Sequence, residues 1–165
     1  MSAQNIITAM EKLVKLHKSL YDLAEKKTQI IKTGDMDALN KIMIDEQKHV
    51  KAIGMIERER EQSVLEFLQR NNSAELVPNL SSCIGLAEDS EKETLNDLKQ
   101  SLVESVLKLK VANYLNQQLI YQSLQFINLS LDMVRPSPKA FNYEKPVQQK
   151  GQYQAGNRSY FNSKA

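Results

Sequence analysis

Cysteine, histidine, tryptophan, glycine and proline are all scarce in this chain, and their scarcity excludes several classes of protein. The 165 residues include one cysteine, two histidines, no tryptophan, five glycines and four prolines. The single cysteine, Cys83, cannot form an internal disulfide, so we expect a reducing compartment and a small buried hydrophobe at this position. Few glycines and prolines leave few turns, while Leu, Lys, Glu, Gln and Ala are abundant and favour helices. These observations predict an all-α fold.

Groups that could carry catalysis or bind a metal are equally sparse. His17 and His49 fall on different predicted helices, and only His49 has a glutamate, Glu46, at the Glu-x-x-His spacing that di-iron helical bundles use twice. The chain has no glycine-rich phosphate loop, nucleophile elbow or cysteine pair. We therefore expect no catalytic residues, no metal site, no cofactor and no enzymatic activity. Both histidines are interpreted as solvated residues or as residues of a helix seam.

Long apolar runs are also missing, and the charges are unevenly placed. No apolar run approaches about 18 residues and no charged-then-apolar leader begins the chain, so we expect neither a membrane span nor a signal peptide, but a cytoplasmic protein. Residues 135–165 hold six basic residues against one acidic residue, a charge of +5, whereas residues 1–134 hold 16 against 19, a charge of −3. The slightly acidic body disfavours a nucleic-acid-binding helical protein, which needs a basic helix face.

Apolar residues recur at steps of three and four along most of the chain, which is the spacing of amphipathic helices. The pattern predicts helices over about 3–33, 36–70 and 91–134, with a short helical turn over about 80–88. Gly34 and Asp35 predict a hairpin turn, because glycine tolerates the left-handed geometry of a helix C-terminus and aspartate caps the next N-terminus. Ser90 to Glu93 offers a capping box for the third long helix. We expect an elongated antiparallel hairpin plus a long third helix, arranged as a three-helix, coiled-coil-like bundle.

Composition divides the chain after residue 135. Residues 1–135 form the predicted helical domain, and residues 136–165 are rich in Pro, Gly, Gln, Asn, Ser and Lys. Such a segment cannot bury enough apolar surface to offset its ordering entropy. We therefore expect a flexible basic tail that is disordered on its own.

The end of the third long helix is apolar over more than one face. Nine apolar residues between positions 119 and 134 fill an arc of roughly 220°, whereas a surface helix usually needs a stripe of about 100°. We expect one part of this arc to pack on the hairpin and the remainder to accept an amphipathic helix from outside. The alternative is a self-associating coiled-coil protein, in which two copies of the segment cover each other.

Asn113 and Asn116 fall close to the apolar seam of the same helix, where leucine would be less costly. One interpretation is a polar layer that fixes the register between helices. The other is a pair of amides that hydrogen-bond the backbone of a docking segment. The sequence leaves both interpretations open.

These residues also carry a resemblance to a known family. The order Asn113, Asn116, Leu119, Ile120, followed by Leu124, Phe126 and Ile127, resembles the Asn-x-x-Asn-x-x-Leu-Leu and Leu-x-Phe/Tyr-Ile elements near the end of FlgN-like flagellar export chaperones. Lys26-Lys27, Gly34-Asp35 and Leu39 are similar to the hairpin turn of that family. The resemblance covers roughly residues 1–134.

The resemblance implies a cytoplasmic type III flagellar export chaperone for the hook-associated proteins of the hook–filament junction. Such a chaperone binds the C-terminal helical segments of its clients, keeps them unassembled and delivers them to the export gate. The client-binding region of the family maps here to Asn113, Asn116, Leu119, Ile120, Leu124, Ile127, Leu131 and Val134.

Docking on the cytoplasmic domain of the gate, a membrane protein, has two candidate residues, Tyr143 and Tyr121. We expect a monomer or weak dimer that binds no nucleic acid and does not insert into the membrane. Three matters stay open: which junction protein is the client, whether the tail docks on the gate, and whether it covers the empty groove instead.

Overall fold

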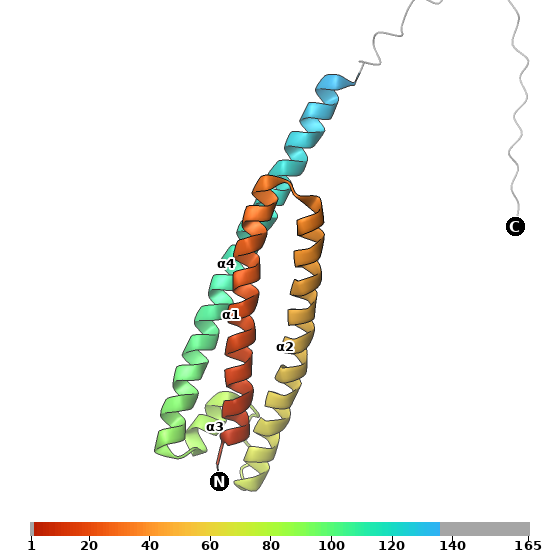
Figure 1. Cartoon of the computed structure of the whole chain (residues 1–165). Coiled ribbons are helices and arrows are strands. Elements are labelled where there is room, and N and C mark those ends of the chain that lie inside the picture. The colour runs from red at the N-terminus through yellow and green to blue at the C-terminus, as the bar shows by residue number, and fades with distance from the viewer. Residues whose placement is uncertain (1, 136–165) are drawn as a thin grey trace, which may run out of the picture. The chain divides into compact units, whose positions relative to one another are not determined.

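Four α-helices and no strand make up residues 2–135, the part of the chain that the structure describes (Figure 1). In this computed structural model the helices are α1 (Gln4–Thr33), α2 (Met36–Arg70), α3 (Leu80–Leu86) and α4 (Asp89–Val134). The all-α prediction is confirmed, and each helix begins and ends within two residues of the bounds expected from the sequence. The predicted tail, residues 136–165, lies outside the described residues.

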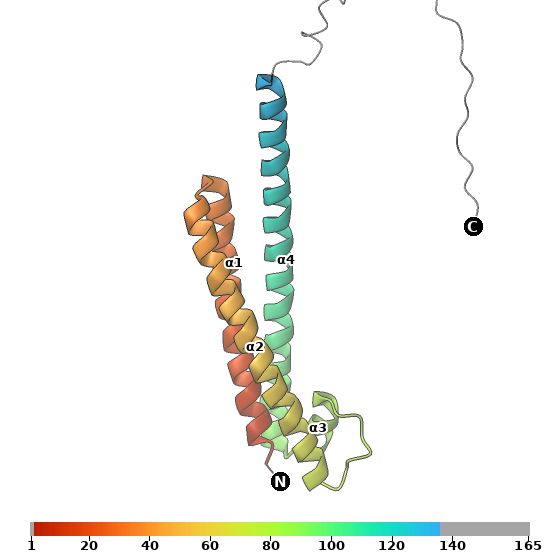
Figure 2. The same cartoon turned by 90° about the vertical axis from the view of Figure 1, so that its right-hand side faces the viewer.

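The chain divides into two compact units, Met1–Asn128 and Leu129–Ala165, and α4 spans the division. The packing described below is that of the first unit. There, α1 and α2 form an antiparallel hairpin, and α4 lies alongside α1 and runs in the same direction (Figure 1 and Figure 2). The short helix α3 lies at the end of this unit where the chain begins.

Gly34 and Asp35 form the hairpin turn that the sequence predicts. Gly34 has a φ of 72°, in the left-handed region, and its N–H donates to the carbonyl oxygens of Ile30 and Ile31 at 3.0 and 3.2 Å. Any residue with a Cβ atom is strained in this conformation, which explains the glycine. The Asp35 carboxylate then accepts a hydrogen bond from the Ala38 N–H at 3.0 Å and caps the start of α2.

The hydrophobic core lies at the opposite end of the hairpin from this turn. It joins the first half of α1, the last turns of α2, α3 with the residue after it, and the start of α4. Leu98 and Leu102 of α4 pack against its buried members, which are Ala3, Ile6, Ile7, Met10, Leu13, Val64, Phe67, Leu68, Cys83, Ala87 and Leu95. Stability is therefore concentrated where all four helices meet.

The short helix α3 closes the base of this core. Asn79 caps it by accepting a hydrogen bond from the Ser82 N–H at 2.9 Å. Cys83 is fully buried, and burial raises the pKa of its thiol, an effect that the nearby Arg60 partly opposes. The thiol therefore stays protonated and packs as a small hydrophobic group, as the sequence predicts.

The capping box predicted at Ser90 and Glu93 is wrong, because Ser90 lies inside α4, and the neighbouring Glu91 has a role that the sequence analysis did not predict. The helix α4 begins two residues before it, at Asp89. The Glu91 carboxylate instead accepts hydrogen bonds from the Ser2 hydroxyl at 2.6 Å and from the Ala3 N–H at 3.0 Å. It thus caps the N-terminus of α1, where Ala3 has no capping side chain of its own.

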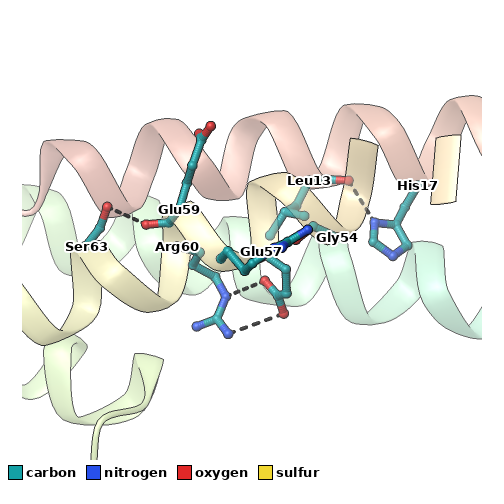
Figure 3. A network of polar contacts seen from close by, with 8 residues as sticks. Leu13, His17, Gly54, Glu57, Glu59, Arg60 and Ser63 are labelled. Carbon is teal, nitrogen blue, oxygen red and sulfur yellow. Dashed lines mark hydrogen bonds and ion pairs between the residues drawn. The ribbon is translucent and has the colours of Figure 1, made fainter. Parts of the chain in front are cut away.

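Polar groups join α1 to α2 over the rest of the hairpin. Lys27 Nζ lies 2.9 Å from a carboxylate oxygen of Glu46, and both side chains are only 16% exposed. Further along, Lys12 pairs with Glu59 across the two helices at 3.4 Å. Within α2, Arg60 and Glu57, three residues apart, form a bidentate ion pair (Figure 3). Because charge-assisted hydrogen bonds depend on direction, the two pairs that join the helices, Lys27–Glu46 and Lys12–Glu59, favour one alignment of the hairpin.

We expect Leu95→Ala to lower the free energy of unfolding by about 3 kcal/mol, because it leaves a cavity among residues that cannot collapse fully. Chemical denaturation followed by circular dichroism measures this value. Leu107→Ala is the matched control, since Leu107 lies on the same helix and is 56% exposed. Its effect should stay within about 0.5 kcal/mol. Equal losses for the two variants would contradict the placement of the core.

Acid should destabilise the chain partly through Glu91. The hydroxyl of Ser2, followed by the N–H groups of Ala3 and Glu88, holds the pKa of Glu91 below its ordinary value of 4.5. Its contribution to stability is therefore complete above the unfolded-state pKa and is lost as the pH falls through the folded-state pKa. In thermal melts between pH 7 and pH 3, Glu91→Gln should show a smaller drop in melting temperature than the wild type. Glu93→Gln, an exposed carboxylate on the same helix, should melt like the wild type at each pH.

Candidate functional site

Past Ile120, α4 keeps its apolar side chains, but they are exposed. Leu119 and Ile120 are half-buried, Leu124 and Ile127 are 54% and 50% exposed, and no residue from 121 to 128 is buried. Ile120, Leu124 and Ile127 recur at steps of four and three and therefore share one side of the helix. Leu119, Ile120, Leu124 and Ile127 are called the late α4 face below.

The lengths of the helices explain this exposure. Thr28 of α1 hydrogen-bonds Asn116 of α4, which aligns the two parallel helices at that level. Beyond this pair, α1 continues through residues 29–33, about 8 Å of helix, whereas α4 continues through residues 117–128 of the first unit, about 18 Å. The last turns of α4 in this unit therefore extend past the end of α1.

In the first unit, the start of the apolar arc is partly covered by the hairpin, as the sequence analysis expects for one part of it. Leu119 and Ile120 are half-buried, and Ile120 lines a groove with Leu20 and Val50 of the hairpin. Every residue from 121 to 128 is exposed, because α4 extends past the end of α1. Leu124 and Ile127 are therefore open to a partner.

Leu131 and Val134, the remaining apolar candidates, belong to the second unit, Leu129–Ala165. They lie on the final turns of α4 and are exposed. Along the helix they continue the spacing of the late α4 face, at steps of four and three after Ile127.

Asn116 is turned toward α1 and is only 2% exposed. Its side-chain N–H donates to the carbonyl oxygen of Ala24 at 2.8 Å, and its side-chain oxygen lies 2.6 Å from the Thr28 hydroxyl. That hydroxyl also lies 3.1 Å from the Ala24 carbonyl, but it has one proton, and its shorter contact is with Asn116. The methyl side chain of Ala24 leaves room for the amide to reach the backbone. This geometry favours the register-fixing interpretation for Asn116.

Asn113 lies one turn earlier and is exposed. It lines a small groove of about 280 Å³ on the side of α4 that faces both hairpin helices, together with Leu20, Lys27, Glu46, Val50, Asn116, Gln117 and Ile120. The Lys27–Glu46 ion pair lies in this groove. Of the two asparagines, only Asn113 therefore presents its amide at the surface.

A larger apolar groove, which the sequence analysis missed, lies between α1 and α4. It has a volume of about 790 Å³ and is lined by Leu107, Lys108, Val111, Ala112 and Leu115 of α4 and by Tyr21, Glu25, Lys26, Thr28 and Gln29 of α1. Leu107, Val111 and Leu115 recur at steps of four, a pattern visible in the sequence. Helical spacing alone does not show that this stripe lies beside the buried seam rather than in it.

The comparison with protein families decides what kind of molecule carries these surfaces. The model of the FlgN protein family matches residues 1–151. This chain belongs to the FlgN family. FlgN proteins are flagellar export chaperones and not enzymes, so the resemblance seen in the sequence and the prediction of a non-enzymatic protein are confirmed.

A curated relative supports the same assignment over most of the chain. The uncharacterized protein YvyG of Bacillus subtilis (strain 168) is 38% identical over 149 residues, which cover 89% of each of the two chains. No solved structure matches this FlgN-family chain.

Of the two tyrosines considered for export-gate docking, the structure describes only Tyr121. Tyr121 is exposed on α4 of this FlgN-family chain, and its hydroxyl accepts a hydrogen bond from the Gln125 amide at 2.9 Å. Tyr143 lies outside the described residues.

The histidines hold positions within the hairpin. His17 Nδ1 lies 2.9 Å from the Leu13 carbonyl oxygen (Figure 3), and His49 Nε2 lies 2.8 Å from the Ser19 hydroxyl across the seam. Within residues 2–135 of this FlgN-family chain, no three His, Cys, Asp or Glu side chains are grouped so that they could hold a metal ion. None of the helices described here combines the length and the hydropathy that crossing a bilayer requires.

Proposed function

We propose that this chain holds the C-terminal helical segment of a hook-associated protein on the late α4 face, keeps that client unassembled and delivers it to the flagellar export gate. The observation that carries the proposal is the exposure of Leu124 and Ile127 on a helix whose neighbour has ended. Family membership supports the class of client, because the FlgN family implies hook-associated partners.

The spacing of the exposed residues favours a helical occupant. Ile120, Leu124, Ile127, Leu131 and Val134 follow one another at steps of four, three, four and three. This is the spacing of the seam residues of a coiled coil, in which each side chain fits between four residues of a facing helix. An extended strand would match alternate residues instead.

The energetics require a long contact. Fully burying a Leu or Ile side chain contributes about 1.5–3 kcal/mol, and Leu124 and Ile127 are already half covered, so each gains about 1 kcal/mol from a partner. Ordering a flexible client segment costs about 2–5 kcal/mol. Two residues therefore do not suffice, and the proposed site includes Leu119, Ile120, Leu131 and Val134 as well. A modest surplus keeps the client releasable at the gate.

The two asparagines contribute differently in this proposal. Asn113 is exposed beside the groove that Ile120 also lines, so its amide can hydrogen-bond a client backbone. The amide of Asn116 is occupied by α1, so Asn116 acts on the client through the position of α4.

Delivery requires a contact with the cytoplasmic domain of the export gate, a membrane protein. Tyr121 and Tyr143 remain the proposed residues for this contact. The proposal places the chain in the cytoplasm, as FlgN chaperones are, and treats it as a monomer or weak dimer before the client binds.

Replacing Leu124 and Ile127 together with Asp should abolish client binding, because two charges would enter an apolar contact. Isothermal titration with the synthetic C-terminal segment of a hook-associated protein from the same genome measures the loss, expected to exceed about a hundredfold, or about 2.7 kcal/mol. Helix content by circular dichroism should be unchanged, since both residues are exposed.

Met36→Asp with Ile44→Asp is the matched control for this double variant. Both residues are exposed apolar residues of α2, at 64% and 56%. Binding should survive this pair of substitutions. If the α4 variant still binds the peptide as tightly as the wild type, the late α4 face is not the client site.

The mass in solution separates a chaperone from a self-associating coiled coil. Light scattering should give one copy of the chain alone and a one-to-one complex after the client peptide is added. A tight dimer whose mass does not respond to the peptide would instead support the structural alternative, with the coiled-coil seams of two copies covering each other.

A further inference from the structure

Apolar packing alone does not fix how α4 lies on α1 beyond the core. Leu107, Val111 and Leu115 form one exposed apolar stripe of α4, and the half-buried Ile120 forms a second stripe on a different side with the exposed Leu124 and Ile127. The apolar contacts of α4 with the core end at Leu102, well before Asn116. Some directional interaction must therefore select the alignment that the structure shows.

We propose that Asn116 and Thr28 are positioning residues that fix the rotation and axial register of α4 on α1, and thereby hold the late α4 face in position for a client. The claim about register stands on the geometry of these two residues. The claim about the client rests on the function proposed above.

The hydrogen bonds of Asn116 make this selection because they run in both directions. The amide donates to the Ala24 carbonyl at 2.8 Å and accepts from the Thr28 hydroxyl at 2.6 Å, and Ala24, Thr28 and Asn116 are all buried. In any other register the amide or the hydroxyl would be buried without its partner, which is more costly than a displaced methyl group. A buried asparagine selects register between helices in this way at some expense of stability.

The position of the Thr28–Asn116 contact along the helices supports this positioning role. The last α4 residue that packs against the core is Leu102, four helical turns before Asn116 at about 3.6 residues per turn. The Thr28–Asn116 contact therefore holds α4 close to the end of α1. A change in the direction of α4 at this point displaces the residues of the late α4 face. Ile120 and Leu124 come one and two turns later.

Asn116→Leu tests the register directly, because it removes the hydrogen bonds of the amide and replaces it with an apolar side chain of similar size. Spin labels on Cys introduced at Lys32 and Gln122, both exposed, report the distance between α1 and α4 in a Cys83→Ala background. The wild type should give one narrow distance distribution. Asn116→Leu should broaden it or add a population displaced by about 5 Å, one helical turn. An unchanged narrow distribution overturns the proposal.

Two comparisons distinguish the loss of the Asn116 hydrogen bonds from a general loss of packing. Thr28→Val keeps the shape of the side chain and loses the hydroxyl, so it should broaden the distribution as Asn116→Leu does, whereas Thr28→Ser keeps the hydroxyl and should restore the narrow one. Gln118→Leu is the control for an amide-to-leucine change at an exposed position of α4 and should leave the distribution unchanged. If Asn116→Leu fails to fold, the two Thr28 variants decide the outcome.

Client binding is measured on the same variants with the C-terminal peptide of a hook-associated protein. Asn116→Leu and Thr28→Val should weaken binding about tenfold or more with little change in melting temperature, while Gln118→Leu binds normally. Altered distances with unchanged affinity would overturn the positioning role for the client. If the wild type does not bind the peptide but the distances still change, the proposed function fails and the register claim stands.

Discussion

The offset between α1 and α4 is the constraint on which the rest of this molecule depends. Two parallel helices are tied side by side at Thr28 and Asn116, and one of them then ends within five residues while the other continues. Leu124 and Ile127, which α4 places past the end of α1, are exposed, whereas Leu95 near the start of α4 is buried. The exposure of these two residues thus follows from unequal helix length, and it requires no local unfolding.

This arrangement separates the residues that stabilise the fold from those proposed to bind a client. The buried side chains of the core gather where α1 and α4 begin, α2 ends and α3 packs against them, and Glu91 closes that end by capping α1. Because the apolar burial is complete there, the far part of α4 can remain uncovered without leaving the fold unstable. A chaperone that must release its client benefits from this separation, since loss of the client exposes a surface but does not remove part of the core.

Between these two regions polar groups join the helices alongside buried apolar residues such as Leu20, Ala24 and Ile42. The Lys27–Glu46 ion pair and the Ser19–His49 contact join the hairpin, and the Asn116 amide joins α4 to it. Partly buried ion pairs and amides add little net stability compared with leucines of similar volume, but they tolerate only one geometry. Their presence indicates that this part of the molecule depends on a defined alignment more than on tight packing. The FlgN family match over residues 1–151 covers all of these contacts.

The sequence by itself determined the elements that depend on neighbouring residues. Three local properties carried these predictions. The three- and four-residue spacing predicted the helices, and the glycine and aspartate of the turn predicted the hairpin. The single small apolar cysteine predicted the role of Cys83. The tertiary structure alone decided that Glu91 caps α1, that Asn116 faces Ala24 and Thr28, and that Leu107, Val111 and Leu115 line a groove. It also showed that Leu124 and Ile127 lie where α4 extends past the end of α1. The reason is physical: these features depend on the axial offset and rotation between helices distant in the chain, and no window of residues along one helix contains that information.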